Sequence, residues 1–457
     1  MFEPDAESMP AEQRAAIQQD RLRGLVDRLL LASGIGSGGG SGGVQGRRLK
    51  AIGVTGGGDV TLDDLPHLPT TAKDDMWDAY PLGMLAVDQS EVVAFHGSSG
   101  TGGRPTLVAY TRRDLALWAR MCARALAAAG ATSRSIVHNA YGYGLFTGGL
   151  GIHQGAIELG AAVVPASGGM TERQVTLIRD LRPDILTCTP SYAIRLGEAL
   201  AEAGLAGELS LAAGVFGAEP WSAELRARIE DLLGVRALDI YGLAEVIGPG
   251  VAAECIEAAD GLHVNEDHFL VEAVDPATGA PVPDGTQGEL VFTTPTKEAL
   301  PLLRYRTGDI AALRRGPCAC GRTLVKMSRI TGRRDDMLVV RGVNVYPSEV
   351  ERVLLTEQAL GAHYLLVLDE RGDVPQLIAC CEYSTESLPS SGSAGAWPSV
   401  ADLESRLREA LGVGVGVRVL PAGTVPRTEV GKAVRVARWR GGGPPLPGLD
   451  CWLESPL

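Results

Sequence analysis

Short apolar runs alternate with longer amphipathic stretches between about residues 91 and 330. The runs typical of strands are VVAFHG, SIVHNA, AAVVPA, DILTCTP, LAAGVFG, RALDIYG and ELVFTT. The stretches typical of helices are RRDLALWARMCARALAAAG, TERQVTLIRDL, YAIRLGEALAEAG and WSAELRARIEDLLG. This alternation predicts an α/β fold, with a large N-terminal domain of mostly parallel sheets and flanking helices. Such sheets bind ligands at the carboxyl ends of their strands.

A small α+β domain is predicted for the rest of the chain. TGRRDDMLVVRGVNVYPSEVERVLL indicates a strand pair, a turn and a helix. HYLLVLDE, PQLIACCEYS and VGVRVLP indicate further strands, and ADLESRLREALG indicates another helix. We therefore divide the chain into residues 1–332 and 333–457, with the boundary in the polar stretch Thr331–Asp336.

The N-terminal segment begins with a predicted helix over residues 11–32, whose apolar side chains fall on one face. The run SGIGSGGGSGG that follows is of the flexible linker type and predicts a mobile surface loop. Further on, LDDLPHLPTTAKDDM indicates turns and then a helix capped by Thr70 or Thr71.

Composition excludes several classes of protein. The formal charge of -13, without a long basic run, argues against nucleic-acid binding. No apolar run reaches the roughly 18 residues of a membrane span, and the acidic N-terminus does not resemble a secretory signal. We therefore expect a soluble cytoplasmic protein. Eight cysteines in 457 residues do not make a disulfide scaffold, and Cys122 and Cys188 are expected to be buried thiols.

A glycine-rich loop, HGSSGTGGRP, occupies residues 96–105 after an apolar strand. Its backbone N–H groups can surround an anion, while Ser98, Ser99 and Thr101 add hydroxyls and Arg104 adds charge. The loop lacks the Lys-Ser/Thr pair of a P-loop. Taken alone, it is equally consistent with a phosphate site and with a mobile loop, and His96 with a site role or a structural one.

Three later stretches favour an enzyme that activates a carboxylic acid with ATP. DIYGLAEVIGPG places an aromatic ring, a glycine turn and a carboxylate after a strand, and LPLLRYRTGDI ends on Asp309. TEVGKAVRV carries Lys432, one of only five lysines in the chain. A stacking ring, a metal carboxylate, a ribose-binding carboxylate and a mobile cation are the groups that such chemistry needs.

A family resemblance rests on seven motifs that occur in order. They are HGSSGTGGRPTLVAYT, YGYGLFTGGLGIHQGAIELGAAVVPASGG, VFGAEPW, DIYGLAEVIGPG, LRYRTGDI, ITGRRDDMLVVRGVNVYPSEVE and VGKAVRV. Together, from about residue 10 to 440, they resemble the adenylate-forming superfamily, specifically its phenylacetate–CoA ligase branch. The resemblance implies that a carboxylate attacks the α-phosphorus of MgATP and that CoA then captures the acyl-adenylate.

The resemblance also implies roles for individual residues. Glu245 would bind Mg²⁺, Tyr241 would stack on adenine and Asp309 would accept the ribose hydroxyls. Lys432 would bridge the acyl carboxylate and the α-phosphate, and the mobile C-terminal domain would swing about a hinge at Asp335. The other nucleotide-binding residues would be Ser98, Ser99, Gly100, Thr101, Gly103, Arg104, Gly217, Ala218, Glu219, Pro220, Asp239, Gly242 and Arg333. In the phosphate loop, Gly102 and Arg104 replace the threonine and lysine usual in the family; arginine keeps the charge.

The acid pocket is expected near YGYGLF, with Tyr141 and Phe146 flanking an aromatic acid beside Ala218 and Gly242. Phenylacetate and a substituted benzoate remain equally open. So does the acceptor, which is CoA in the favoured interpretation and a carrier-protein thiol or an amine in the alternative. A non-catalytic nucleotide-binding protein is a third interpretation, which the intact Glu245, Asp309 and Lys432 argue against. A homodimer is the oligomeric state that the family suggests.

A structural metal site is predicted apart from this chemistry. Cys318 and Cys320 form a Cys-x-Cys pair, and Cys255 and His263 lie upstream. These four residues supply the N/S ligand set of a closed zinc site. Four unbridged thiol and imidazole groups are the alternative.

Overall fold

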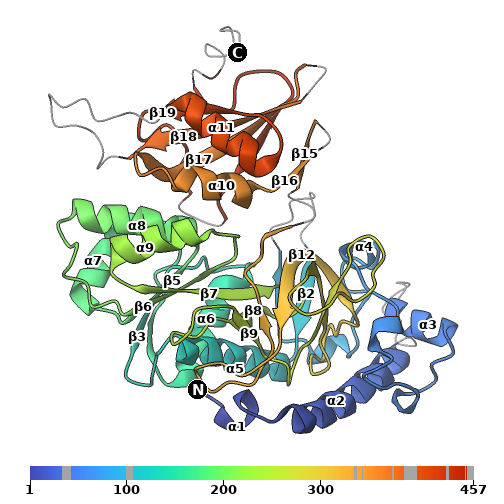
Figure 1. Cartoon of the computed structure of the whole chain (residues 1–457). Coiled ribbons are helices and arrows are strands. Elements are labelled where there is room, and N and C mark those ends of the chain that lie inside the picture. Colours follow the sequence, from blue (N-terminus) through green and yellow to red (C-terminus); the bar gives the residue numbers. More distant parts are fainter. Residues whose placement is uncertain are drawn as a thin grey trace, which may run out of the picture.

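The computed structural model describes residues 1–32, 43–98, 106–333, 337–341, 343–372, 375–384, 399–428, 432–447 and 449 (Figure 1). The helices are α1 (Pro4–Glu7), α2 (Ala11–Ala32), α3 (Val44–Ala51), α4 (Lys73–Asp78), α5 (Arg112–Ala128), α6 (Thr147–Leu159), α7 (Thr171–Leu181), α8 (Pro190–Glu202), α9 (Ala223–Leu233), α10 (Pro347–Leu355) and α11 (Val400–Leu411). Short 3-10 turns lie at Gly57–Asp59, Leu65–His67 and Gln89–Glu91.

The strands of the first part of the chain are β1 (Ala94–Gly97), β2 (Leu107–Tyr110), β3 (Ile136–Asn139), β4 (Ala162–Val164), β5 (Ile185–Cys188), β6 (Ala213–Gly217), β7 (Arg236–Leu243), β8 (Gly248–Ala253), β9 (Leu262–Val264), β10 (Leu270–Val274), β11 (Gln287–Thr293), β12 (Tyr305–Arg314), β13 (Lys326–Met327) and β14 (Gly332–Arg333). The remaining strands are β15 (Leu338–Val340), β16 (Val343–Val345), β17 (Leu360–Asp369), β18 (Gln376–Tyr383), β19 (Val415–Leu420) and β20 (Val436–Trp439).

One large mixed sheet organises the first part. Within the described residues it has twelve strands in the order β10-β11-β12-β13-β9-β8-β7-β6-β5-β3-β4, with β14 paired to β12. The pairs β4–β3, β3–β5, β5–β6 and β6–β7 are parallel, and the pairs from β7 to β10 are antiparallel. The α/β class is therefore confirmed, while the parallel arrangement is limited to one end of the sheet.

Helices cover both faces of this parallel end. Val215 of β6 joins the core beneath α5 and α6, whereas the next residue, Phe216, joins the core beneath α8 and α9. Adjacent side chains of a strand point to opposite faces. A strand that is apolar at both positions, such as AGVFG, is therefore buried on both sides.

The second part has a separate core. Its sheet has the order β19-β18-β17-β20, with β15 and β16 as a separate hairpin. Leu354 of α10, Leu366 of β17 and Leu407 of α11 belong to one cluster of buried side chains. In Figure 1 this part (orange and red) lies beyond α8 and α9. The predicted strands and helices of this region are confirmed, and the exact division at residues 332 and 333 stays a prediction.

The expected start of α4 is wrong. The helix begins at Lys73, and Ala72 rather than Thr70 or Thr71 occupies the N-cap position. Thr71 is turned inward, because its hydroxyl donates to the backbone oxygen of Leu303 at 2.8 Å. The Asp75 carboxylate accepts the Ala72 N–H instead.

No helix of the described residues is both long and apolar enough to cross a membrane. The predicted mobile loop lies outside the described residues, except for its last glycine.

Two helical glycines provide a test of this packing. A Cβ on Gly155 of α6 would lie 2.3 Å from the Cβ of Cys122 on α5, whereas a Cβ on Gly24 of α2 would meet nothing within 4 Å. We expect Gly155→Ala to lower the free energy of unfolding by about 1–3 kcal/mol through overpacking. Gly24→Ala should raise it by about 0.5–1 kcal/mol, because alanine is the better helix former. Denaturant unfolding of both variants measures the difference, and equal effects would contradict the close α5–α6 approach.

Candidate active site

The carboxyl ends of β6 and β7 form the centre of the candidate site. The chain leaves β6 through Gly217 and then Ala218, whose φ of 72° is unusual for a residue with a side chain. At the end of β7, a Cβ on Gly242 would lie 1.9 Å from the backbone oxygen of Gly248. Glycine is therefore required at residue 242, and the turn can bring Glu245 back beside the sheet.

A buried carboxylate lies next to Tyr241. The Tyr241 hydroxyl donates to Oδ2 of Asp309 at 2.7 Å, and Nε of Arg333 lies 3.1 Å from Oδ1. Asp309 and Arg333 are also partners in the β12–β14 ladder. Burial raises the pKa of Asp309, while the charge of Arg333 and the Tyr241 hydroxyl oppose that rise. The Tyr241 ring stacks on Phe292, with their centroids 5.9 Å apart.

Glu245 is supported from beneath by a lysine that the sequence did not single out. Lys297 is fully buried and donates to the backbone oxygen of Glu245 at 2.9 Å. Its ammonium lies 5.1 Å from the ring centroid of Tyr110, whose hydroxyl donates to the backbone oxygen of Ile247. The turn that carries Glu245 is therefore held by two buried side chains. The scarcity of lysine was the signal that could have identified Lys297.

Lys432 reaches this site from the second part of the chain. Its side chain keeps exposed surface, but the surrounding protein removes water from the ammonium, and this desolvation lowers its pKa. Arg333 lowers it further, whereas the carboxylates of Asp309, Glu245 and Glu219 raise it. Lys432 therefore lies within electrostatic reach of the predicted site residues in the large domain.

The predicted acid pocket begins after β3. Tyr141 is buried and Phe146 is half-buried at the N-cap position of α6. A Cβ on Gly148 would lie 3.4 Å from the Tyr141 ring. Burial raises the pKa of Tyr141 well above its usual range, so this side chain is a neutral phenol at pH 7. Tyr141 and Phe146 of YGYGLF thus place one buried and one partly exposed aromatic ring at the same end of the sheet as Ala218, and Tyr143 between them is half-buried.

The remaining predicted nucleotide residues divide into three groups. Ser98 lies at the end of β1, where its N–H donates to the Thr106 oxygen. Asp239 is buried beside Glu254, and burial followed by that neighbouring charge raises its pKa. Ser99, Gly100, Thr101, Gly103 and Arg104, with Gly102, lie outside the described residues, as does the predicted hinge Asp335.

His96 has packing contacts rather than charged partners among the described residues. Its Nδ1 lies 3.2 Å from the backbone oxygen of Leu145. Its ring meets the Tyr110 and Trp118 rings edge-on. Burial lowers the pKa of His96. These contacts favour a structural role.

The four predicted zinc ligands come together in the structure. The ligand atoms of Cys255, His263, Cys318 and Cys320 all lie within 4.8 Å of one another. The Cys255 and Cys318 sulfurs are 3.7 Å apart, and the Cys320 sulfur is 3.6 Å from Nε2 of His263. Zinc–sulfur bonds of about 2.3 Å in a tetrahedron place two sulfurs about 3.8 Å apart. The arrangement therefore has the dimensions of a tetrahedral metal site.

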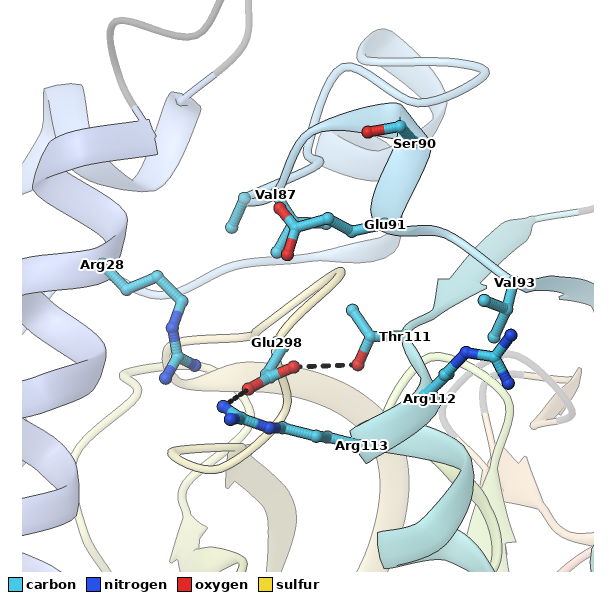
Figure 2. A pocket seen from close by; sticks show the side chains of 10 residues that line it. Arg28, Val87, Ser90, Glu91, Val93, Thr111, Arg112, Arg113 and Glu298 are labelled. Carbon is cyan, nitrogen blue, oxygen red and sulfur yellow. Dashed lines mark hydrogen bonds and ion pairs between the residues drawn. The ribbon is translucent and has the colours of Figure 1, made fainter.

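A cavity of about 590 Å³ lies between α2, residues 86–93 and the start of α5 (Figure 2). Figure 2 shows Glu298 between Arg113 and Thr111, and it accepts a hydrogen bond from each at 3.0 and 2.9 Å. Arg28 donates to the backbone oxygen of Lys297. None of the described predicted site residues lines this cavity, so it is separate from the candidate active site.

The comparisons with known proteins agree with this geometry. The sequence pattern of the AMP-binding enzyme family matches residues 53–297, and that of the AMP-binding enzyme C-terminal domain matches residues 342–440. The chain is 47% identical to a phenylacetate–coenzyme A ligase of Thermus thermophilus over 95% of this chain and 99% of that protein. It is also 47% identical to the phenylacetate–coenzyme A ligase of Escherichia coli, over 85% of this chain and 89% of that protein.

This chain is similar in structure to a 2-hydroxyisobutyryl-CoA ligase, and the match covers 96% of this chain and 92% of the ligase chain. At 28% identity, the TM-score is 0.87 for its postadenylation state with 2-HIB-AMP. The TM-score is 0.69 for its thioesterification state with 2-HIB-AMP and CoA. The arrangement of the two parts of this chain is therefore more similar to the postadenylation state.

The chain belongs to the family of AMP-binding enzymes. Its two matched domains and the site at the ends of β6 and β7 define an adenylate-forming enzyme that uses ATP and CoA. Within that class it is a member of the phenylacetate–CoA ligase branch, whose members are AMP-forming acid–thiol ligases acting on aryl acids.

Because Asp309 is predicted to bind the ribose of ATP, its hydrogen bond with Tyr241 predicts a shift in the pH dependence of ATP binding. The Tyr241 hydroxyl holds the pKa of Asp309 down, so Tyr241→Phe should raise that pKa further. The carboxylate form would then be lost at a higher pH as the solution is acidified. We expect the acid-side loss of ATP affinity to move upward in pH, as measured by titration calorimetry. Asp309→Asn should remove this titration, and an unchanged profile in Tyr241→Phe would contradict the assignment.

Proposed function

We propose that this enzyme activates an arylacetic acid, with phenylacetate as the first candidate, and transfers the acyl group to CoA. The named substrate of the relatives at 47% identity supports the acid. The placement of Lys432 within electrostatic reach of Asp309 and Glu245 is the observation that carries the proposal. It joins a cation from one domain to carboxylates of the other, as expected for a site that brings two anions together.

The first half-reaction forms an acyl-adenylate. An oxygen of the acid attacks the α-phosphorus of ATP, the bond to the β-phosphate oxygen breaks, and pyrophosphate leaves. The Lys432 ammonium offsets the repulsion between the acid and the α-phosphate, and a cation already in place stabilises the transition state. Asp309 accepts the ribose hydroxyls, Arg333 contacts the ribose or phosphate side, and Tyr241 lies against the adenine. The backbone of Gly217, Ala218 and Pro220 borders the base, and the loop from Ser98 to Arg104 holds the β- and γ-phosphates.

Glu245 fits a magnesium ligand. Its carboxylate is buried at the end of the sheet, on a turn that Lys297 fixes by its backbone oxygen. Hard oxygen ligands suit Mg²⁺, which would neutralise charge on the phosphates.

The second half-reaction needs a different arrangement of the domains. The thiol of CoA attacks the acyl carbon, the bond from that carbon to the phosphate oxygen breaks, AMP leaves with the bonding electrons, and the thiol proton passes to solvent. The C-terminal domain rotates about Asp335, removes Lys432 and presents another face. The higher TM-score to a postadenylation state than to a thioesterification state supports the view that the present arrangement serves the first half-reaction.

The aromatic pocket accounts for the choice of acid. Tyr141 and Phe146 come from either side of the Gly-rich turn that starts α6, and Ala218 and Gly242 leave room because they lack bulk. Apolar discrimination of one methylene is worth only about 1–3 kcal/mol, so phenylacetate and benzoates should differ in rate rather than all-or-none.

Pyrophosphate release with MgATP and a panel of aryl acids, with and without CoA, tests the proposal. We expect a burst with phenylacetate alone and steady turnover when CoA is present. Lys432→Ala should lower the burst rate by about 10²–10³-fold, as for loss of a preorganised transition-state donor. Lys50→Ala, on the exposed face of α3, is the matched control and should behave as wild type.

Other outcomes would redirect the proposal. Release that ignores CoA would favour a carrier-protein thiol or an amine as the acceptor. Wild-type release in Lys432→Ala would contradict the role of that lysine, and no release with any acid would contradict the substrate class.

We also propose that Cys255, His263, Cys318 and Cys320 hold a structural zinc ion. Their ligand atoms have the spacing of a closed tetrahedral site, and three of the four residues are buried. Such an ion would tie the loops after β8 and β12 together and would take no part in the chemistry.

Metal analysis of the unchelated protein should find about one zinc per chain. Cys320→Ser should lose it and lower the melting temperature, because metal binding to the folded state stabilises that state. Cys380→Ala removes a buried thiol outside the cluster and should keep the zinc. The site would be contradicted if the unchelated wild-type protein contained no zinc and a chelator left its melting temperature unchanged.

A further inference from the structure

The Glu219 carboxylate joins the two domains through backbone donors. Its Oε1 accepts the N–H of Ser191 at 2.7 Å, and its Oε2 accepts the N–H of Ala433 at 2.9 Å. Ser191 lies in the first turn of α8 in the large domain, and Ala433 follows Lys432 in the other domain. One side chain therefore fixes the backbone next to the lysine relative to a helix of the large domain.

Local structure directs Glu219 toward both donors. Ala218 adopts the left-handed region with φ of 72°, and Pro220 restricts Glu219 from the other side. The N–H of Ser191 lies in the first turn of α8, so it has no acceptor within the helix and can donate to Glu219. The helix dipole also favours a negative charge at this end of the helix. Glu219 is thus held in the large domain whether or not Ala433 is present.

A second set of contacts holds the same segment two residues further on. Nη2 of Arg435 donates to the Ser191 hydroxyl at 3.1 Å. It also lies 3.8 Å from Oε2 of Glu351. Its guanidinium carbon is 4.3 Å from the ring centroid of Tyr364. The segment that begins at Lys432 is therefore attached to the start of α8 twice. Ala433 is attached through Glu219, and Arg435 contacts Ser191 directly.

Two further polar contacts join the domains without involving the backbone at Ala433. Glu351 of α10 accepts the Ser222 N–H at the start of α9 at 2.9 Å. His363 of β17 lies 3.0 Å from a carboxylate oxygen of Glu198 on α8. In Figure 1, α10 and β17 lie on the side of the second domain that faces α8 and α9. Among these contacts, the Glu219 contact is the one that holds Ala433, the residue next to Lys432.

We propose that Glu219 is a positioning residue for Lys432 in the adenylating arrangement. This inference rests on the proposed function, because it assigns Glu219 a part in placing the cation of the first half-reaction. The Ala433 contact must break when the second domain rotates and takes Lys432 away. Glu219 is therefore needed to form the acyl-adenylate and is dispensable for its capture by CoA.

Separate measurement of the half-reactions tests this inference. We expect Glu219→Ala to slow single-turnover pyrophosphate release by about 10–100-fold, the effect of a misplacement of about 1 Å. Thioester formation from synthetic phenylacetyl-adenylate and CoA should stay within about twofold of wild type, and it also shows that the variant is folded. Glu219→Gln keeps the shape and one acceptor oxygen, so its loss should be intermediate.

A double variant separates positioning from direct contact with the nucleotide. If Glu219 acts through Lys432, adding Glu219→Ala to Lys432→Ala should slow adenylation no further. Glu198→Gln is the matched control, because it weakens a contact between the domains, with His363, that does not involve the backbone at Ala433. It should slow adenylation by less than about fivefold, as expected for a partly exposed ion pair.

Three results would overturn the inference. The first is an equal loss in both half-reactions, and the second is a loss confined to the KM for ATP, which would indicate direct binding of nucleotide by Glu219. The third is a multiplied loss in the double variant. Failure of the proposed function would be seen separately, because wild-type protein would then release no pyrophosphate with phenylacetate.

Discussion

The hydrogen-bonded Asp309 carboxylate is the point on which the arrangement of the site depends. Tyr241 reaches it from the end of β7, and Arg333 reaches it from β14, the last described strand before the second domain. A buried carboxylate without such donors would be neutralised rather than left charged. Because its donors come from the sheet and from the segment leading to the second domain, the interactions that oppose the rise in the pKa of Asp309 also tie β14 to β12 of the large sheet.

The large sheet places these groups by combining two kinds of strand. The parallel strands β5, β6 and β7 deliver their carboxyl ends to one edge, as the alternating sequence predicts. The antiparallel strands then bring Asp309 of β12 within hydrogen-bond distance of Tyr241 of β7, although β13, β9 and β8 lie between these strands in the sheet and Asp309 follows Tyr241 by 68 residues. A purely parallel sheet would present only strand ends, whereas the mixed sheet also presents the side chain of Asp309 within β12.

The sequence predicts the buried parallel strands and the types of site residue better than it predicts the contacts between distant segments. Apolar runs such as AGVFG identify buried strands, and the four N/S ligands were grouped correctly from their residue types and order. The helical pattern does not predict α6, because TGGLGIHQGAIEL contains glycines where helix formers are expected. A Cβ at Gly151 or Gly155 would clash with Trp118 or Cys122, which approach this helix closely. The pairing of β9 with β13, the support of Glu245 by Lys297 and the contact of Glu219 with Ala433 join residues distant in sequence. No periodic pattern encodes such contacts.

The domain contact combines a small apolar part, in which Ala362 and Leu355 pack against the cluster beneath α8 and α9, with polar pairs that suit the domain rotation proposed above. Glu198, Glu219 and Glu351 each lie on one side of the contact and are paired with donors from the other. Separating apolar surfaces would cost free energy in proportion to the area exposed to water. Separating hydrogen-bonded carboxylates costs less, because water replaces each lost donor and the net value of such a bond is only about 1–3 kcal/mol. A contact built from carboxylates can therefore orient Lys432 accurately and still release it.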